Sequence, residues 1–570
     1  MHSNPLIVQG DLTVLVDVDT PRYPAARDAL ARFAELIKSP EHIHTYKISP
    51  LSIWNACAAG TTDGEIVTAL TEYARFPLPA HVAAQIRDFA GRYGRVRIER
   101  DTGDPTDSHL LLMTDDAVLA EELLHQRALG ALLVDRVSPT AFRIGNVDRG
   151  RIKQALIKVG FPAEDVAGYT AGSVLAIALR DATVSGQPFA LRDYQNDAVA
   201  AFHAGGTDRG GSGVVVLPCG AGKTVVAMGV MAAVGASTLI LTTSVTAVRQ
   251  WIAELRDKTS IPADLIGEYT GESKDVRAVT VATYQVLTHR SHATGEFTHL
   301  ALFDQRNWGL IVYDEVHLLP APVFQITATL QARRRLGLTA TLVREDHRED
   351  DVFALIGPKK ADVPWKVLER QGWIATATCT EVRVPLPDEL RMPYAVAEQR
   401  EKFRVASENP LKLDVVRALL RKHAGEPALV IGLYVDQLET LAREMNLPLI
   451  TGTTPQKKRD VLFAAFRNGK LPALIVSKVA NFAIDLPDAS VAIQVSGSFG
   501  SRQEEAQRLG RILRPKQGAN QAHFYTIVTA DTTEQDFALK RQLFLCEQGY
   551  EYQIVDVPDG NVAHSLQTLP

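Results

Sequence analysis

The stretch "GVVVLPCGAGKT", residues 213–224, joins an apolar run to a glycine-rich loop. The aliphatic run predicts a buried strand, and the helical pattern after residue 224 predicts a helix that begins where the loop ends. This strand, loop and helix are the context in which a phosphate-binding loop forms, although the strict pattern has glycine where Leu217 stands. The alternative, a chance glycine-rich loop, is disfavoured by that context. The stretch therefore predicts an α/β nucleotide-binding fold.

The loop residues have separate roles in such a site. Glycines let backbone N–H groups approach the phosphates, the lysine reaches the terminal phosphates, and the threonine hydroxyl is a ligand for Mg²⁺. The predicted phosphate site consists of Gly220, Ala221, Gly222, Lys223 and Thr224.

From residue 213 onward, apolar runs alternate with helical patterns. A first series occupies 213–217, 237–242, 278–284, 309–315 and 335–341, and a second occupies 427–433, 472–478, 490–496 and 522–528. Such alternation is typical of parallel sheets with helices on both faces. The sequence therefore predicts two sheets of the same kind in tandem.

A second polar motif, "VYDEVH" at residues 312–317, ends one of these apolar runs. Asp314 is suited to hold Mg²⁺ through water, and Glu315 to orient and deprotonate an attacking water. Acidic residues at strand ends are common, but together with the phosphate loop they predict a nucleoside triphosphate hydrolysis site. Upstream, Gln195 is a candidate adenine reader; an ordinary helix-surface glutamine is the alternative.

The second half contains "SRQEEAQRLGRILRP", residues 501–515, in which arginines recur at three-residue steps. On a helix they would share one face, which usually meets solvent or acidic neighbours. In an enzyme with two sheet domains, arginines of the second can instead contact the γ-phosphate bound to the first. The arginines on this face are Arg508, Arg511 and Arg514.

Composition limits the class of protein. A length of 570 residues predicts three or four domains, and a net charge of -5 confines any nucleic-acid contact to a local surface. The four cysteines are far apart and form no Cys-x-x-Cys pair, which predicts reduced thiols rather than disulfides or a cysteine-based zinc site. Without an export signal or a membrane-spanning run, a cytoplasmic location is expected.

The N-terminal part has a mixed pattern. Residues 21–38 have helical periodicity, and 49–76 predict two helices joined at Gly60, the second capped by Thr62 or Asp63. These helices suggest a helix-turn-helix or winged-helix module, or a small helical domain without a DNA role. Between residues 94 and 144 the order of two strands, a helix and two strands predicts a small α+β unit.

Together the motifs resemble the superfamily 2 helicases, and more narrowly the XPB family in its bacterial form. The resemblance extends over nearly the whole chain and rests on "LPCGAGKT", "DEVH", "GLTATLVRED", "LIGPK", "SKVANFAIDLPDA" and "SRQEEAQRLGRILRP". It implies two tandem RecA-like lobes after mixed α+β N-terminal domains. It also implies DNA-dependent ATP hydrolysis, with ATP and Mg²⁺ as cofactors, that drives 3′–5′ helicase movement in DNA repair.

The resemblance also implies residue roles. Gln195 would read adenine, Lys223 and Thr224 would bind phosphate and Mg²⁺, and Asp485 would help to hold nucleotide from the second lobe. Arg511 and Arg514 match finger arginines. Residues that would couple hydrolysis to movement are His317, Thr339 and Thr341, and those that would contact DNA are Arg344, Glu345, Asp346 and Lys478. A second triplet, 348–350, has no counterpart and is interpreted as a solvated face.

The expected domains follow from the patterns and the resemblance. They are an N-terminal helical or winged-helix-like domain (1–90), a small α+β domain with a linker (91–180), lobe 1 (181–370), lobe 2 (371–555) and a tail (556–570). A short thumb is expected at 386–410, with a plain connector as the alternative. The α+β domain stands where the family can carry damage recognition, a role inferred from position.

The expected partners are duplex, forked or single-stranded DNA and a repair nuclease or other repair protein, with no membrane. Three alternatives remain: a duplex translocase or remodelling subunit that does not separate strands, an RNA helicase, and a DNA-binding module with a degenerate nucleotide site. The sequence Asp-Glu-Val-His, in place of Asp-Glu-Ala-Asp, disfavours the RNA helicase. The intact Lys223, Asp314 and Glu315 disfavour the degenerate module.

Overall fold

The computed structural model describes residues 4–39, 42–104, 106, 108–218, 220–290, 298–331, 333–340, 349–363, 365–477, 489–497, 520–547, 550 and 552–557. The chain divides into two compact units. The first consists of Met1–Glu35, His42–Leu217 and Gly222–Val363, and the second of Leu36–Glu41, Pro218–Ala221 and Pro364–Pro570. Within the described residues, no helix is both long and apolar enough to cross a bilayer.

The N-terminal region combines a four-stranded sheet, in the order β1-β2-β4-β3, with four helices. The strands are β1 (Leu6–Val8), β2 (Thr13–Asp17), β3 (Glu35–Lys38) and β4 (Ile43–Lys47), and the helices are α1 (Tyr23–Leu30), α2 (Pro50–Ala58), α3 (Asp63–Tyr73) and α4 (Ala80–Arg92). The helix predicted for residues 21–38 is wrong in its second half, because 35–38 pair as a sheet strand, and pairing outweighs local periodicity. The turn at Gly60 and the Thr62 cap are confirmed.

A small α+β domain follows, with a five-stranded sheet in the order β7-β8-β6-β5-β9. Its elements are β5 (Val96–Arg100), β6 (His109–Thr114), α5 (Ala117–His125), α6 (Arg127–Gly130), β7 (Leu133–Ser138), β8 (Ala141–Gly145), α7 (Arg149–Lys158) and β9 (Ala163–Asp165). The predicted order of two strands, a helix and two strands is confirmed. The short β9, which pairs parallel to β5, was not predicted.

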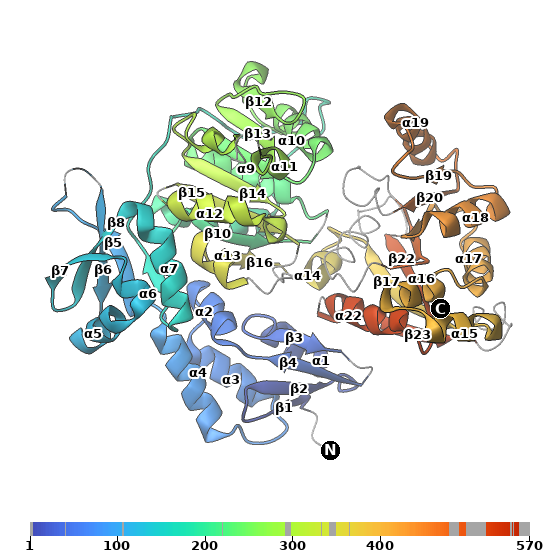
Figure 1. The fold of residues 1–570 in the computed structure, drawn as a ribbon, viewed down its shortest axis with the longest axis horizontal. Helices are drawn as coiled ribbons and strands as arrows, with labels where there is room; N and C mark the ends of the chain where they lie inside the picture. Colours follow the sequence, from blue (N-terminus) through green and yellow to red (C-terminus); the bar gives the residue numbers. More distant parts are fainter. Residues whose placement is uncertain are drawn as a thin grey trace. The chain divides into compact units, whose positions relative to one another are not determined.

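Lobe 1 is the parallel seven-stranded sheet β12-β13-β11-β14-β15-β10-β16 with its helices (Figure 1). All five predicted strands are present, and their residues are almost entirely buried. The polar or short edge strands β12 and β16 were not predicted. The strands are β10 (Ser212–Val216), β11 (Thr238–Thr242), β12 (Ile266–Tyr269), β13 (Val279–Thr283), β14 (Leu310–Asp314), β15 (Arg334–Thr339) and β16 (Lys359–Asp362). The helices are α8 (Asp193–His203), α9 (Lys223–Val234), α10 (Val245–Lys258), α11 (Tyr284–Leu287), α12 (Ala321–Thr329) and α13 (Glu349–Leu355).

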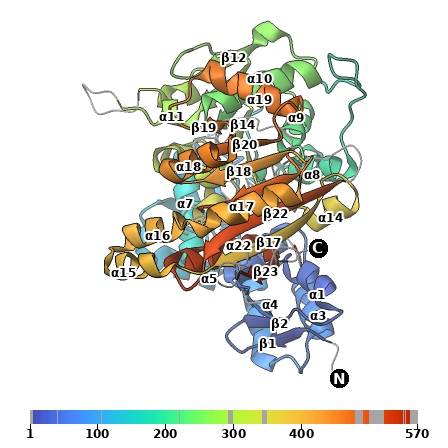
Figure 2. The same cartoon turned by 90° about the vertical axis from the view of Figure 1, so that its right-hand side faces the viewer.

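Lobe 2 is a second parallel seven-stranded sheet, β19-β20-β18-β21-β22-β17-β23. In Figure 2, α17 and α18 lie over its strands. The strands are β17 (Thr376–Val384), β18 (Ala428–Gly432), β19 (Leu449–Ile450), β20 (Ala473–Ser477), β21 (Val491–Gln494), β22 (Gln521–Thr529) and β23 (Tyr552–Asp556). The described helices are α14 (Trp365–Arg370), α15 (Asp388–Val396), α16 (Gln399–Ser407), α17 (Leu411–Lys422), α18 (Val435–Met445), α19 (Gln456–Arg467) and α22 (Thr533–Glu547).

The two sheets confirm the predicted fold class. In lobe 2 the four predicted strands are present, whereas β17, β19 and β23 were not predicted. Threonines at alternate positions of β17 hid a strand that lies inside the sheet, between β22 and β23. The thumb candidate, 386–410, contains α15 and α16, which pack against each other; its role stays a prediction.

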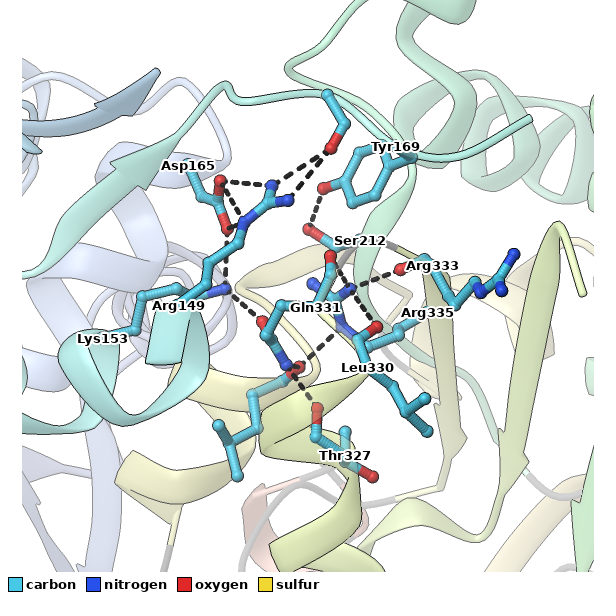
Figure 3. A network of polar contacts seen from close by, with 12 residues as sticks. Arg149, Lys153, Asp165, Tyr169, Ser212, Thr327, Leu330, Gln331, Arg333 and Arg335 are labelled. Carbon is cyan, nitrogen blue, oxygen red and sulfur yellow. Dashed lines mark hydrogen bonds and ion pairs between the residues drawn. The ribbon is translucent and has the colours of Figure 1, made fainter. Parts of the chain in front are cut away.

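A buried polar network joins the small α+β domain to lobe 1 (Figure 3). Arg149 and Lys153, both on α7, contact the carboxylate of Asp165 at 2.5 Å and 3.0 Å. Lys153 also donates to Gln331 Oε1 at 2.8 Å, across 178 positions of sequence. These side chains are buried, so water cannot replace their hydrogen bonds if the contacts are broken. The network therefore holds α7 on lobe 1.

The lobe 1 side of this network is anchored by Arg335, at the start of β15. Its Nε donates to the carbonyl of Leu355 at 2.7 Å, and Gln331 donates to the same carbonyl at 3.0 Å. Arg335 is completely buried, whereas most of the other buried residues in the strands of lobe 1 are apolar. The α+β domain therefore contacts the strand that ends at Thr339.

Candidate nucleotide-hydrolysis site

The phosphate loop connects β10 to α9. Gly220 and Gly222 have φ values of 82° and 83°, which residues with a side chain rarely adopt. A Cβ on Gly222 would lie 2.5 Å from Nε2 of Gln195, so a side chain at this position would collide with the glutamine. Lys223 and Thr224 form the first turn of α9, where free N–H groups and the helix dipole favour an anion.

Lys223 lies beside the acidic pair at the end of β14. Its Nζ is 2.7 Å from Oε1 of Glu315, and both side chains are largely buried. Asp314, which precedes Glu315, is the last residue of β14. The structure therefore brings the phosphate loop and the Asp-Glu motif together, although they are separated by 92 positions.

Asp314 is held by lobe 1 on several sides. Trp251 Nε1 donates to its Oδ2 at 2.8 Å, Thr242 Oγ1 lies 3.5 Å from the same atom, and Tyr284 donates to its backbone carbonyl at 2.9 Å. Burial, together with the neighbouring Glu315 carboxylate, raises the pKa of Asp314 to about 6. A nearby cation would stabilise the ionised form of the Asp314 carboxyl group.

The donor set fits Mg²⁺, which prefers hard oxygen ligands. The Asp314 carboxylate and the Thr224 hydroxyl would hold the ion, and the raised pKa of Asp314 marks a position where a divalent cation would relieve electrostatic repulsion. No soft or nitrogen ligand is needed for this assignment.

Glu315 leads to a chain of contacts that reaches the end of β15. It has a left-handed backbone, with φ 51°, and begins a short 3-10 turn. His317 Nδ1 lies 3.5 Å from Glu315 Oε2 and 2.8 Å from Thr339 Oγ1. The Thr339 carbonyl accepts a bond from the N–H of Leu217 at 3.0 Å. Contacts therefore run from the acid through His317 and Thr339 back to the phosphate loop.

Gln195, on α8, is 3% exposed. The backbone N–H of Arg192 donates to its Oε1 at 2.9 Å. The Gln195 amide lies beside Gly222 of the phosphate loop. This location disfavours the alternative that Gln195 is an ordinary glutamine on a helix surface.

Some predicted site residues lie outside the described residues. They are Thr341, Arg344, Glu345, Asp346, Lys478, Asp485, Arg511 and Arg514. In the second charged triplet, Arg348 also lies outside, whereas Glu349 and Asp350 begin α13 and Asp350 is exposed.

The sequence prediction missed the residues that surround Asp314. Trp251 belongs to α10, which begins after the cap residue Ser244, and Tyr284 follows β13. Tyr284 is the last residue of the predicted run 278–284, and Trp251 lies in the helix that follows the run 237–242, so their places near the carboxyl ends of strands were the available signal. That both residues contact Asp314 follows only from the order of the strands in the sheet.

The phosphate loop and the Asp-Glu pair on a parallel sheet, with a second such sheet following, define the class of P-loop nucleoside triphosphate hydrolases with two sheet domains. Family models match residues 368–567 (ERCC3/RAD25/XPB C-terminal helicase), 188–344 (type III restriction enzyme, res subunit) and 6–138 (helicase conserved C-terminal domain).

Similar whole proteins narrow this class. The chain is 53% identical to "DNA 3′-5′ helicase XPB" of Kineococcus radiotolerans, over 100% of both chains. It is 52% identical to the protein of the same name from Mycobacterium tuberculosis, over 98% of this chain and 99% of the relative. A "helicase/translocase subunit XPB" of general transcription and DNA repair factor IIH, from Antonospora locustae, is 33% identical over 98% and 82%. The chain belongs to the XPB helicase family, which confirms the resemblance noted in the sequence.

Proposed function

We propose that this chain is an ATP-dependent DNA helicase of the XPB type that moves with 3′–5′ polarity and opens duplex in DNA repair. The contact between Lys223 and Glu315 is the observation that carries the hydrolytic part of this proposal. The choice of DNA and of polarity is supported by the bacterial relatives, which are named DNA 3′-5′ helicases.

The ion pair has a direct chemical consequence. Phosphates of an incoming nucleotide offer Lys223 several anionic oxygens, so the lysine turns from Glu315 to the nucleotide. Glu315 is then available to accept a proton from the water that attacks the γ-phosphate.

The remaining lobe 1 residues have positioning roles. Gln195 is suited to hydrogen-bond the adenine edge, and Thr224 and Asp314 would hold Mg²⁺. When bound, that ion neutralises charge on the β- and γ-phosphate oxygens. Trp251 orients the Asp314 carboxylate by donating to Oδ2.

The contacts that connect Glu315 to His317 and Thr339 would couple ATP hydrolysis to movement on DNA. His317 and Thr339 connect the catalytic acid to the end of β15, beyond which Thr341 and the triplet Arg344, Glu345 and Asp346 follow in sequence. Changes at the γ-phosphate can therefore reach the segment proposed to meet DNA.

Lobe 2 residues complete the proposal. Arg511 and Arg514 would contact the γ-phosphate, Asp485 would help hold the nucleotide, and Lys478 would contact DNA. Backbone contacts of this kind give binding that is salt-sensitive and independent of base sequence. A cytoplasmic location and a repair nuclease or other repair protein as partner are part of the same proposal.

The deciding experiment measures ATP hydrolysis by the purified full chain with single-stranded, duplex and forked DNA and with RNA. DNA should stimulate turnover and RNA should not. Lys223→Ala should remove stimulated turnover while leaving the circular dichroism spectrum unchanged. Stimulation by RNA alone would assign the chain to RNA, and near-normal turnover in Lys223→Ala would refute the hydrolysis site.

A second candidate is a duplex translocase that does not separate strands, favoured by the words "helicase/translocase" in the name of the Antonospora locustae relative. Unwinding of a forked duplex and displacement of a triplex strand distinguish the two. A helicase gives both activities, and a pure translocase only displaces the triplex strand. Polarity is read from forks with a single 3′ or 5′ tail.

A further inference from the structure

A cluster of two histidines and one glutamate lies in lobe 2. His423 follows the last residue of α17, Glu426 lies in the turn before β18, and His523 is on β22. One potential ligand atom from each residue lies within 4.8 Å of the corresponding atoms of the other two. Among the described residues, this is the one group of three histidine, cysteine or acidic side chains that lie close enough together to hold a metal ion.

The turn between α17 and β18 is shaped to direct two of these side chains together. The backbone N–H of Glu426 donates to the carbonyl of His423 at 3.0 Å, and Gly425 has φ 96°, a conformation that favours glycine. This turn brings Glu426 Oε1 to 2.9 Å from His423 Nδ1. The two donors are thus fixed by the backbone as well as by their own contact.

The third donor comes from a strand distant in sequence. The register places Ala428 beside Val491 and Val491 beside His523, so β22 presents His523 in the row of residues where β18 begins. The rings of His423 and His523 have centroids 4.6 Å apart, with an angle of 41° between their planes.

Tyr525 supplies an outer contact of the kind that metal-binding histidines have. Its hydroxyl lies 2.8 Å from His423 Nε2, on the other side of the ring from Glu426. Alternate residues of a strand point to the same face, so Tyr525 and His523 face His423 together. A hydrogen bond from Nε2 to the hydroxyl fixes the orientation of the imidazole and makes Nδ1 the nitrogen that would bind an ion, which would replace the proton now shared with Glu426.

The chemistry of the three donors selects the class of ion. Imidazole nitrogens suit Zn²⁺ and other late first-row ions and do not suit Mg²⁺, which prefers oxygen. Two histidines and one glutamate are a known zinc donor set, with a remaining position for water. Tetrahedral zinc places donor atoms about 3.3 Å apart, and the ligand atoms here lie within 4.8 Å of one another, so a bound ion would draw them closer together.

The position of the cluster separates it from nucleotide chemistry. Glu426 precedes β18 and His523 is near the start of β22, so the cluster lies at the amino ends of parallel strands. Nucleotides bind such sheets at the opposite, carboxyl edge. An ion here would link the end of α17, the turn and β22 inside lobe 2.

We propose that His423, Glu426 and His523 form a structural binding site for a divalent transition metal, with Zn²⁺ as the ion that fits best. The alternative is a hydrogen-bonded cluster that holds no ion.

The test uses the full chain without a histidine tag, stripped with chelator and titrated with Zn²⁺ against a chromophoric zinc indicator in the presence of excess Mg²⁺. The excess Mg²⁺ occupies oxygen sites such as that of Asp314. Wild type should bind one equivalent of Zn²⁺ more than His523→Gln or Glu426→Gln. Glu444→Gln, an exposed carboxylate of the neighbouring α18, is the matched control and should retain the equivalent.

Two further measurements separate a metal site from a merely structural contact. Tyr525→Phe keeps the ring and removes the hydroxyl, and should weaken Zn²⁺ binding about 10-fold or more. Zn²⁺ should raise the melting temperature of wild type and leave that of His523→Gln unchanged. Equal Zn²⁺ binding by wild type and both ligand variants overturns the proposal, as does the absence of tight binding by wild type. Because the readout is metal binding, failure here is independent of ATP hydrolysis.

Discussion

Nζ of Lys223 lies 2.7 Å from Oε1 of Glu315. The lysine expected to bind phosphate and the acid expected to activate water therefore form an ion pair with each other. Their side chains are 12% and 17% exposed, so the two charges interact more strongly than they would in bulk water. We expect nucleotide binding to release Glu315, since the phosphates would compete with Glu315 for the same ammonium group.

Replacing Glu315 by glutamine removes the base and keeps the size of the side chain. We expect kcat for DNA-stimulated ATP hydrolysis to fall by about 100-fold or more, with a small change in KM. Steady-state hydrolysis assays measure both constants. Glu272→Gln, on the same lobe with a mostly exposed side chain, is the control. A parallel loss in Glu272→Gln, or unchanged kcat in Glu315→Gln, would contradict the assignment.

Trp251→Phe keeps an aromatic ring in α10 and removes the N–H that donates to Asp314. This hydrogen bond lowers the pKa of Asp314 against the effect of burial, so its loss should raise that pKa further above about 6. At limiting Mg²⁺, where protons compete with the ion for Asp314, the acid limb of the pH-rate profile should move to higher pH, with turnover near pH 6.5 reduced about 10-fold. Trp308→Phe removes an indole N–H elsewhere in lobe 1 and should leave the profile in place.

Thr339→Val removes the hydroxyl that contacts His317 and conserves side-chain volume. Because Glu315 and Lys223 are unchanged, ATP hydrolysis should remain within about 3-fold of wild type, whereas unwinding of forked DNA should fall by 10-fold or more. Hydrolysis and unwinding are measured on the same preparation. Equal loss of both activities would mean that Thr339 supports catalysis rather than coupling.

The buried network of Figure 3 predicts an asymmetry between two charge removals. Asp165→Asn leaves Arg149 and Lys153 buried without their shared carboxylate and should destabilise the chain by about 3–5 kcal/mol. Lys153→Met leaves the contact between Arg149 and Asp165 and should cost about 1 kcal/mol or less, since it also removes a desolvated cation. Urea unfolding followed by fluorescence compares the two, and equal effects would show that Lys153 is as necessary as Asp165.

Lys153 also predicts how stability depends on pH. Burial, partly offset by Asp165, lowers the pKa of Lys153 to about 8, from 10.5 for the free side chain. Between these two values the unfolded chain binds more protons than the folded chain, so the free energy of unfolding rises with pH. The rise due to Lys153 should be about 2–3 kcal/mol. It is measured as the difference between wild type and Lys153→Met at pH 8 and pH 10, and a constant difference would contradict it.

Local sequence was sufficient wherever the decisive residues are adjacent. The apolar runs 213–217 and 309–315 predicted buried strands, and the motifs that follow them predicted the phosphate loop and the acidic pair. Strand ends in a parallel sheet meet at one edge, so contact between Lys223 and Glu315 follows from two local patterns and one rule of topology.

Other elements depend on neighbours that the sequence does not place. β17 alternates threonine with other residues and becomes a strand between β22 and β23 because both of its edges are paired. Residues 35–38 have helical periodicity and still form β3, because sheet pairing satisfies their backbone groups.

By itself, the sequence determined the nucleotide-binding class, the two tandem parallel sheets and the acidic and basic groups of the hydrolysis site. Only the tertiary structure decided which side chains surround them: Trp251 and Tyr284 at Asp314, Lys153 against Gln331, and His423 beside His523. The physical reason is distance along the chain. Hydrogen bonds and ion pairs between remote segments depend on strand order and helix packing, and periodicity specifies each element without specifying its partners.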